Sequence, residues 1–235
     1  AEPSTLGVAA GAQLGLTLMT LFAAGWGEGG QQLGALAGGL LAGGLVLAIA
    51  WGRQLSPVTL ILAGLVFGLY GGAVKSLLAL FNHDRLQNLF IWSSGMLNQY
   101  DWSAVQFLWP RMLAAMVLIV LMIRPLTLLG LDDSVVRNLG MRLALVRISG
   151  LLLAVALSAL TVASVGVIGF IGLFAPVLTR LLGVRRLGPR LLCSAALGAG
   201  LLLISDQAVM LLARYWRELP TGAVTALIGA PLMLW

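Results

Sequence analysis

Long apolar runs separated by short polar segments constrain this chain more than any other feature. A helix that spans a membrane needs about 20 predominantly apolar residues. Charged residues make up only 9% of the 235 residues, whereas soluble domains average about 25%. The sequence therefore predicts an all-α, polytopic transmembrane helical bundle with eight crossings. We expect them near 6–24, 33–51, 57–81, 108–123, 143–163, 167–182, 190–213 and 221–235.

The basic residues divide unevenly between the two sides that alternating crossings define. One side holds Arg53, Arg124, Arg137, Arg142, Arg147, Arg180, Arg185, Arg186 and Arg190, and the other holds Lys75, Arg85, Arg111, Arg214 and Arg217. Loops on the cytoplasmic side of a membrane carry the excess of Lys and Arg. We therefore expect the first side to be cytoplasmic. Because these charges are scattered between apolar runs, they indicate a lipid bilayer as the partner and no nucleic acid.

The cytoplasmic segment 124–141 combines charges with apolar residues at roughly helical spacing. Asp132, Asp133 and Arg137 make burial in hydrocarbon costly. Gly130 divides the segment and Gly140 can end its second part. We interpret it as two short helices outside the membrane. A partner protein could push on such a pair, or the pair could be an amphipathic connector that rests on the lipid surface.

The segment 82–107 is predicted to face the other side. It contains Trp92, Tyr100 and Trp102, and such aromatic residues collect at the level of the lipid headgroups. We expect an outer-face interfacial segment with a short helix. The alternative is that it contacts a substrate.

The residue inventory argues against catalysis and against a bound cofactor. Cys193 and His83 are the only cysteine and histidine, which leaves no set of ligands for a transition metal. The only lysine, Lys75, follows Val74 where a phosphate-binding loop needs glycine. The chain is therefore predicted to be non-catalytic, and any ATP hydrolysis would belong to another polypeptide. Lys75 is expected to extend its ammonium group towards the membrane surface.

Two features are candidates for a transport pathway. The crossing 167–182 contains Gly169, Gly172 and Pro176, and a broken helix at membrane depth must line a cavity or be covered by protein. A proline kink tolerated by neighbouring helices is the alternative. Asp206 is an acid inside an apolar run, which is a functional candidate by default. It could serve an ion-coupled secondary transporter, or make a structural hydrogen bond between helices.

Arg214, Arg217 and Glu218 follow Asp206 at the outer rim. Exposed arginines beside an acid could dock a partner protein that carries acidic groups. They could equally anchor the helix end at the membrane surface.

Six short motifs follow one another along the chain. They are AEPSTLG at 1–7, RQLSP at 53–57, IWSSG at 91–95, LGLDDSVVRNLG at 129–140, VIGFIGLFAP at 167–176 and ELPTGAVTALIGAP at 218–231. In this order they resemble the permeases of iron-siderophore and vitamin B12 ABC importers, and their sequences are most similar to the ferric hydroxamate (ferrichrome-type) permeases of that family. Val177 stands where most members have a histidine after the proline, which favours one half, the first, of a fused two-half permease.

The resemblance implies a BtuC-like importer permease fold, with 1–235 as a single permease domain truncated at both ends of a ten-helix half. It implies import of ferric hydroxamates from the periplasm to the cytoplasm by alternating access across the bacterial inner membrane. The implied partners are two cytoplasmic ATP-binding subunits, a periplasmic siderophore-binding protein and a second permease half.

The resemblance also assigns roles to residues. Residues 124–141 would be the coupling helices seated in the ATPase, and Arg214, Arg217 and Glu218 would meet the binding protein. The family arginine at the docking site lies closer to Asp206, where this chain has Met210. The coupling residues would be Gly130, Leu131, Asp132, Asp133, Arg137 and Gly140.

Overall fold

The computed structural model describes residues 5–22, 27–52, 56–81, 95, 102–130, 136, 141–212 and 220–233. Eight helices lie within these ranges. They are α1 (Val8–Phe22), α2 (Gly27–Trp51), α3 (Pro57–Phe81), α5 (Ser103–Leu128), α7 (Leu143–Val165), α8 (Ile171–Leu181), α9 (Leu187–Leu212) and α10 (Thr221–Met233).

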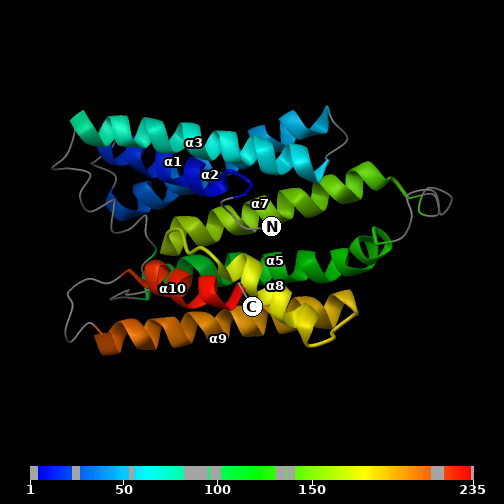
Figure 1. The fold of residues 1–235 in the computed structure, drawn as a ribbon. Helices are drawn as coiled ribbons and strands as arrows, with labels where there is room; N and C mark the ends of the chain where they lie inside the picture. The colour runs from blue at the N-terminus through cyan, green and yellow to red at the C-terminus, as the bar shows by residue number, and fades with distance from the viewer. Residues whose placement is uncertain are drawn as a thin grey trace.

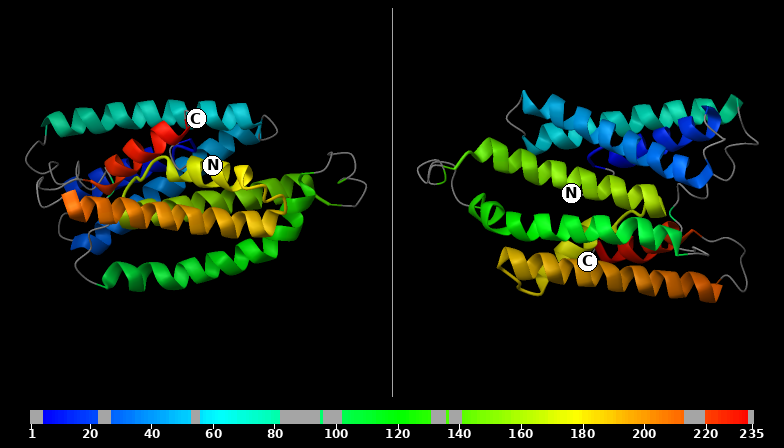
Figure 2. Two further views of the ribbon diagram at one scale, coloured as in Figure 1. Left: turned by 60° about the horizontal axis from the view of Figure 1, so that its bottom comes forward. Right: turned by 180° about the vertical axis from the view of Figure 1, so that it is seen from behind.

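The helices run roughly side by side in one elongated bundle (Figures 1 and 2). α1, α2 and α3 pack together on one side, and α8, α9 and α10 pack together on the other. α7 lies between the two groups, because it contacts α1 and α2 as well as α5. α5 also contacts α9, so α5 and α7 connect the two sides of the bundle.

Successive helices alternate in direction, as the sequence predicted. α2, α5 and α8 end, and α3, α7 and α9 begin, at the same end of the bundle, on the right in Figure 1. We call this the arginine-rich end, because Arg124, Arg142, Arg180 and Arg186 lie at those helix ends. α1, α3, α7 and α9 end, and α2, α5 and α10 begin, towards the opposite end of the bundle (Figure 1).

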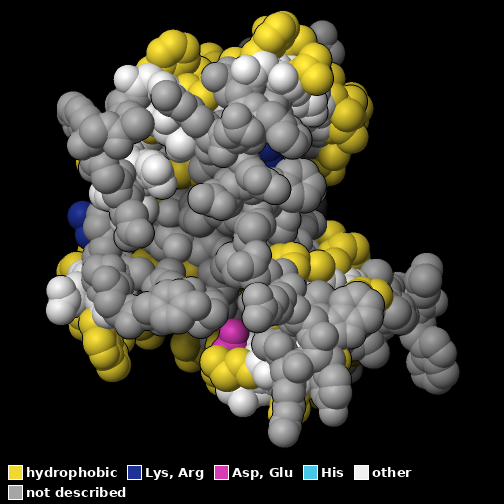
Figure 3. Space-filling model, turned by 90° about the vertical axis from the view of Figure 1, so that its left-hand side faces the viewer, with side chains coloured by type: hydrophobic (Ala, Val, Ile, Leu, Met, Phe, Trp, Pro, Cys, Tyr) yellow, Lys and Arg dark blue, Asp and Glu magenta, His cyan; other side chains and the backbone are white. Residues whose placement is uncertain are grey.

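Five of the described helices are long and apolar enough to cross a membrane, at Gly29–Trp51, Pro57–Leu78, Leu108–Leu128, Leu143–Val165 and Leu187–Leu212. Large hydrophobic side chains remain exposed along them; Leu65 and Leu69 on α3, for example, are 53% and 69% exposed. Figure 3 looks along the bundle from the opposite end and shows hydrophobic side chains gathered on its flanks. Lipid is the medium that covers such flanks, and the predicted all-α multi-pass membrane bundle is confirmed.

Glycines allow α1 and α2 to approach until their backbones touch. A methyl group on Gly15 would overlap the carbonyl oxygen of Gly34, and one on Gly38 would overlap the carbonyl oxygen of Gly11. Helices in lipid associate largely through such close packing, since lipid tails are as apolar as leucine. Gly11 and Gly15 on α1, and Gly34 and Gly38 on α2, are four residues apart, and this spacing places the glycines on the facing sides of the two helices.

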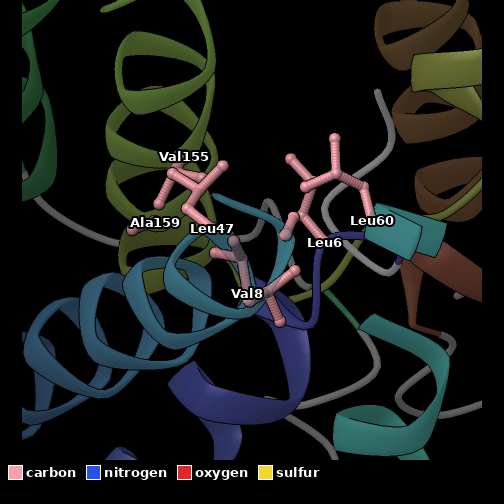
Figure 4. Close-up of a cluster of buried hydrophobic side chains, with 8 residues drawn as sticks. Leu6, Val8, Leu47, Leu60, Val155 and Ala159 are labelled. Carbon is pink, nitrogen blue, oxygen red and sulfur yellow. The ribbon is translucent and has the colours of Figure 1, made fainter. Parts of the chain in front are cut away.

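A cluster of buried side chains joins these two helices to α3 and α7 (Figure 4). Val8 is fully buried, and Val155 and Ala159 of α7 are 2% and 0% exposed. Leu47 and Leu60 contribute from α2 and α3. The cluster fixes α7 against the first three helices.

Several predicted boundaries differ from the structure, among them the start of α5, which lies at Ser103 rather than near residue 108. α2 begins at Gly27 rather than near residue 33, and α8 begins at Ile171 rather than at residue 167. α5 continues through Arg124 and Pro125 to Leu128, so residues 124–128 are its last turns and not a separate short helix. Arg124 is exposed, so its guanidinium can reach the polar interface while the helix continues. The second predicted short helix lies largely outside the described residues.

Candidate functional site

The predicted coupling segment joins α5 to α7 at the arginine-rich end. Its described residues are those up to Gly130, together with Val136 and Met141. The Gly130 N–H donates a hydrogen bond of 3.2 Å to the Thr127 carbonyl, and the Met141 N–H donates one of 3.4 Å to the Val136 carbonyl. Val136 is fully buried, so at this residue the segment is seated on the bundle. Leu131, Asp132, Asp133, Arg137 and Gly140 lie outside the described residues, and their role stays a prediction.

At the opposite end, three segments from distant parts of the sequence meet. The Gly222 N–H, in the first turn of α10, donates a hydrogen bond of 3.2 Å to the Gly95 carbonyl. Gly95 has a φ of +79°, and a methyl group there would lie 2.8 Å from the Val167 carbonyl oxygen. Only glycine suits both the positive φ and the close approach. Through these two contacts Gly95 joins residues 166–170 to the start of α10. We call this meeting point the glycine junction.

The predicted irregular crossing is interrupted at this junction. Residues 166–170 are non-helical, with φ of +77° at Gly166 and +69° at Phe170. A methyl group on Gly229 of α10 would lie 3.1 Å from the Cβ of Phe170. α10 and Gly95 thus cover the irregular backbone, which is one of the two conditions under which non-helical backbone is tolerated inside a membrane.

The three pathway candidates of this crossing, Gly169, Gly172 and Pro176, lie partly in the non-helical stretch and partly in α8. Gly169 belongs to the irregular stretch, where its carbonyl accepts a hydrogen bond of 2.9 Å from the Ile171 N–H. Gly172 and Pro176 belong to α8. Pro176 is thus accommodated inside a helix. Whether any of them lines a pathway stays a prediction.

Asp206 lies on α9, towards the opposite end, and is half-buried. Its carboxylate makes no hydrogen bond or ion pair with the other side chains and backbone groups that the structure describes. Next to it, Ser205 is fully buried, and within the described ranges its Oγ has no hydrogen-bond partner. Among the described residues, Asp206 therefore has no partner for the hydrogen bond between helices that was one of its two predicted roles.

Lys75, which was expected to extend towards the membrane surface, makes a hydrogen bond to a neighbouring helix. Its Nζ donates a hydrogen bond of 3.4 Å to the Gln13 Oε1, and the side chain is half-buried. Gln13 is on α1 and Lys75 on α3, so the bond joins two transmembrane helices. The sequence offered no signal for it, because the residues are 62 positions apart.

The remaining candidates at the opposite end lie outside the described residues. These are Arg214, Arg217 and Glu218, and most of the segment 82–107. Trp102 is described and is 75% exposed. From Ser103 onward that segment belongs to α5. The short interfacial helix and the docking role stay predictions.

The comparison with known families covers the whole chain. The model of the FecCD transport family matches residues 1–235. The chain belongs to the FecCD transport family. The glycine junction joins pieces of three motifs that carried the resemblance, at 91–95, 167–176 and 218–231.

Individual members of the family agree with this assignment. The iron(3+)-hydroxamate import system permease protein FhuB is 57% identical in Salmonella typhimurium strain LT2 and 56% identical in Escherichia coli K12, over 235 residues each. The match covers 100% of this chain but only 34% and 36% of those proteins. The vitamin B12 import system permease protein BtuC of Serratia proteamaculans is 35% identical over 238 residues, which is 100% of this chain and 70% of that protein.

A solved structure shows the same arrangement of helices. It is described as an inward-facing conformation of a metal-chelate type ABC transporter, and it is 30% identical with a TM-score of 0.86. The superposition covers 99% of this chain and 75% of that one. The predicted importer permease fold is therefore confirmed.

Sequence reasoning missed the contacts that build the glycine junction. The IWSSG motif placed Gly95 in a recognisable stretch, but nothing in the sequence paired it with Gly222. Its positive φ and the close approach of Val167 emerge only from the fold. A glycine in an aromatic-rich polar segment was the one available signal.

Proposed function

We propose that this chain is part of the membrane permease of an ATP-driven importer that moves ferric hydroxamate siderophores from the periplasm to the cytoplasm. The observation that carries the proposal is 56–57% identity over the entire chain to FhuB proteins of two bacteria. The chain spans about a third of those proteins, so a second permease half would come from the rest of the polypeptide. The location would be the bacterial inner membrane.

The packing of the bundle provides a mechanical connection through which an ATPase could switch the permease between outward-facing and inward-facing access. Segment 124–141 is directly continuous with α5 and α7, the helices that connect the two sides of the bundle. A displacement of the segment would therefore act on α7, which is fixed to α1 and α2 through Val155 and Ala159. Interfaces with two discrete packings convert such a push into a change of access. Two cytoplasmic ATP-binding subunits would supply it.

The permease itself would perform no covalent chemistry. It would supply a gated route, and a periplasmic siderophore-binding protein would deliver the substrate to the opposite end. Arg214, Arg217 and Glu218 are the proposed contacts for that protein. Iron would remain in its chelator, so the route would need no metal ligands. The described residues contain no cluster of three or more His, Cys, Asp or Glu.

The test is uptake of labelled ferrichrome into proteoliposomes that contain the intact permease, its ATPase and its binding protein. Replacing Asp132, Asp133 and Arg137 together by alanine should abolish uptake while the ATPase alone retains its activity. The matched control is Arg53→Ala, which removes a charge from another connection at the same end and should leave uptake near normal. Normal uptake by the triple variant would contradict the coupling role. Uptake driven by an ion gradient without ATP would contradict the proposed class of transporter.

A further inference from the structure

The short turn between α8 and α9 concentrates positive charge at the arginine-rich end. Arg180 lies in the last turn of α8, Arg185 and Arg186 lie in the turn, and Arg190 lies in the first turn of α9. We call these four residues the basic turn. The first three are exposed and Arg190 is half-buried. The guanidinium groups of the basic turn form no ion pair with any other residue that the structure describes.

The start of α9 adds to this charge. The Arg190 N–H donates a hydrogen bond of 3.0 Å to the Arg186 carbonyl, so the two arginines are one helical turn apart on the same face. Like charges at this spacing repel each other. The N-terminus of a helix also carries partial positive charge, and the first turn of α9 contains no acidic residue. Asp206, the acidic residue of α9, lies near the other end of that helix.

The turn keeps these arginines at the ends of two apolar helices, where the headgroups of a surrounding bilayer would lie. α8 ends at Leu181 and the membrane-spanning stretch of α9 begins at Leu187, so the connection is too short to project far from the bundle (Figures 1 and 2). Large apolar side chains lie directly beside the charges: Leu181, Leu182 and Leu192 are 78%, 62% and 64% exposed. An apolar surface next to a cluster of cations matches a ligand with an acidic head and hydrocarbon chains.

We propose that the basic turn binds the phosphate headgroup of an anionic phospholipid whose acyl chains lie along the exposed leucines of α8 and α9. Basic pockets between transmembrane helices on the cytoplasmic side bind acidic headgroups in this way. A protein partner fits less well, because the turn does not project and its apolar neighbours extend into the membrane-spanning part of α9. The inference does not depend on which substrate the permease carries.

The test measures retention of phosphatidylglycerol by the intact permease, using native mass spectrometry after purification from vesicles of equal phosphatidylglycerol and phosphatidylcholine. The variant is Arg186→Gln with Arg190→Gln. Each arginine near an anionic surface contributes roughly fivefold in affinity, so the pair should weaken retention of phosphatidylglycerol by about 25-fold. Retention of phosphatidylcholine should not change. Arg186→Lys with Arg190→Lys should keep most of the phosphatidylglycerol retention, since the positive charges remain.

The matched control removes two charges from the same end outside the basic turn, by Arg53→Gln with Arg142→Gln. Arg142 is exposed and its side chain makes no capping bond on α7. This control should retain phosphatidylglycerol like the unchanged protein. Equal loss in the control would overturn the proposal, because the effect would then be one of net charge. Unchanged retention in the Arg186 and Arg190 glutamine variant, with loss of ATPase binding instead, would also overturn it and assign the turn to the ATPase.

Discussion

Replacing Gly38 by alanine tests the close packing of α1 against α2. Gly38 lies in the middle of α2, and a methyl group there would overlap the carbonyl oxygen of Gly11 and approach the Cα of Gly15 to 2.9 Å. Both obstacles are backbone atoms, so no side chain can move aside. The two helices would have to separate, which would also loosen the packing of Ala42 against α1.

The magnitude follows from two opposing effects. Alanine is favoured over glycine inside a helix by about 1 kcal/mol, and this gain applies at any helical glycine. Overpacking a tight contact costs about 1–3 kcal/mol, and a backbone contact belongs at the upper end of that range. We therefore expect Gly38→Ala to lower the free energy of unfolding by about 2 kcal/mol. For a unit of 235 residues this corresponds to a fall of roughly 4–8 °C in the melting temperature, and the fall should be smaller in the longer intact permease.

Gly44 provides the matched control on the same helix. A methyl group on Gly44 meets no atom within 4 Å, so Gly44→Ala should be neutral or slightly stabilising. The assay is thermal unfolding of the intact permease in detergent, followed by fluorescence-detected size exclusion. If Gly38→Ala were as stable as the unchanged protein while Gly44→Ala behaved as expected, the backbone contact between α1 and α2 would be refuted.

The other predictions concern single contacts and use the same permease. Gly95→Ala should destabilise it by about 2–3 kcal/mol, because it combines a positive φ with overlap at the Val167 carbonyl; unchanged thermal stability would exclude the glycine junction. Lys75→Met should cost about 1–2 kcal/mol by leaving Gln13 unpaired, and the double variant with Gln13→Leu should recover most of this loss; additive losses in the double-mutant cycle would show that the two side chains do not interact. Asp206→Asn should preserve ATP-driven uptake of ferrichrome into proteoliposomes, and its loss would indicate that Asp206 is needed for transport.

Helix positions were predictable where an apolar run ended at clear local signals. The crossing predicted at 57–81 is α3 with the same bounds. Pro57 occupies the first helical position, and the Ser56 Oγ accepts a hydrogen bond of 3.2 Å from the Thr59 N–H, so sequence and structure agree on where the helix begins. α7 likewise begins at Leu143, as predicted.

Boundaries failed where polar or charged residues continue a helix. The start of α2 is polar, yet Gln31 and Gln32 are helical, because a helix can extend beyond the hydrocarbon into the interface. Arg124 extends α5 for the same reason. Apolar content locates the buried length of a helix but not its full length.

Contacts between distant segments could not be read from the chain. The Gln13–Lys75 bond and the meeting of Gly95 with Gly222 depend on how α1, α3 and α10 are placed in the bundle. Their side-chain types gave no pairing signal. The resemblance grouped the motifs into one family, but the distances between them required the fold.

The most direct test of the account places a cysteine at Asp133 and asks what it touches. Cys193, the only cysteine of this chain, is first replaced by serine, along with any cysteine elsewhere in the intact permease, and Asp133→Cys is then combined with a bifunctional thiol reagent in inverted membrane vesicles containing the ATPase. We expect a crosslinked product between permease and ATPase, with a yield that changes when ATP is added. If position 133 instead reacted only with impermeant reagents applied from the periplasmic side, the segment would face outward and the proposed coupling would be contradicted.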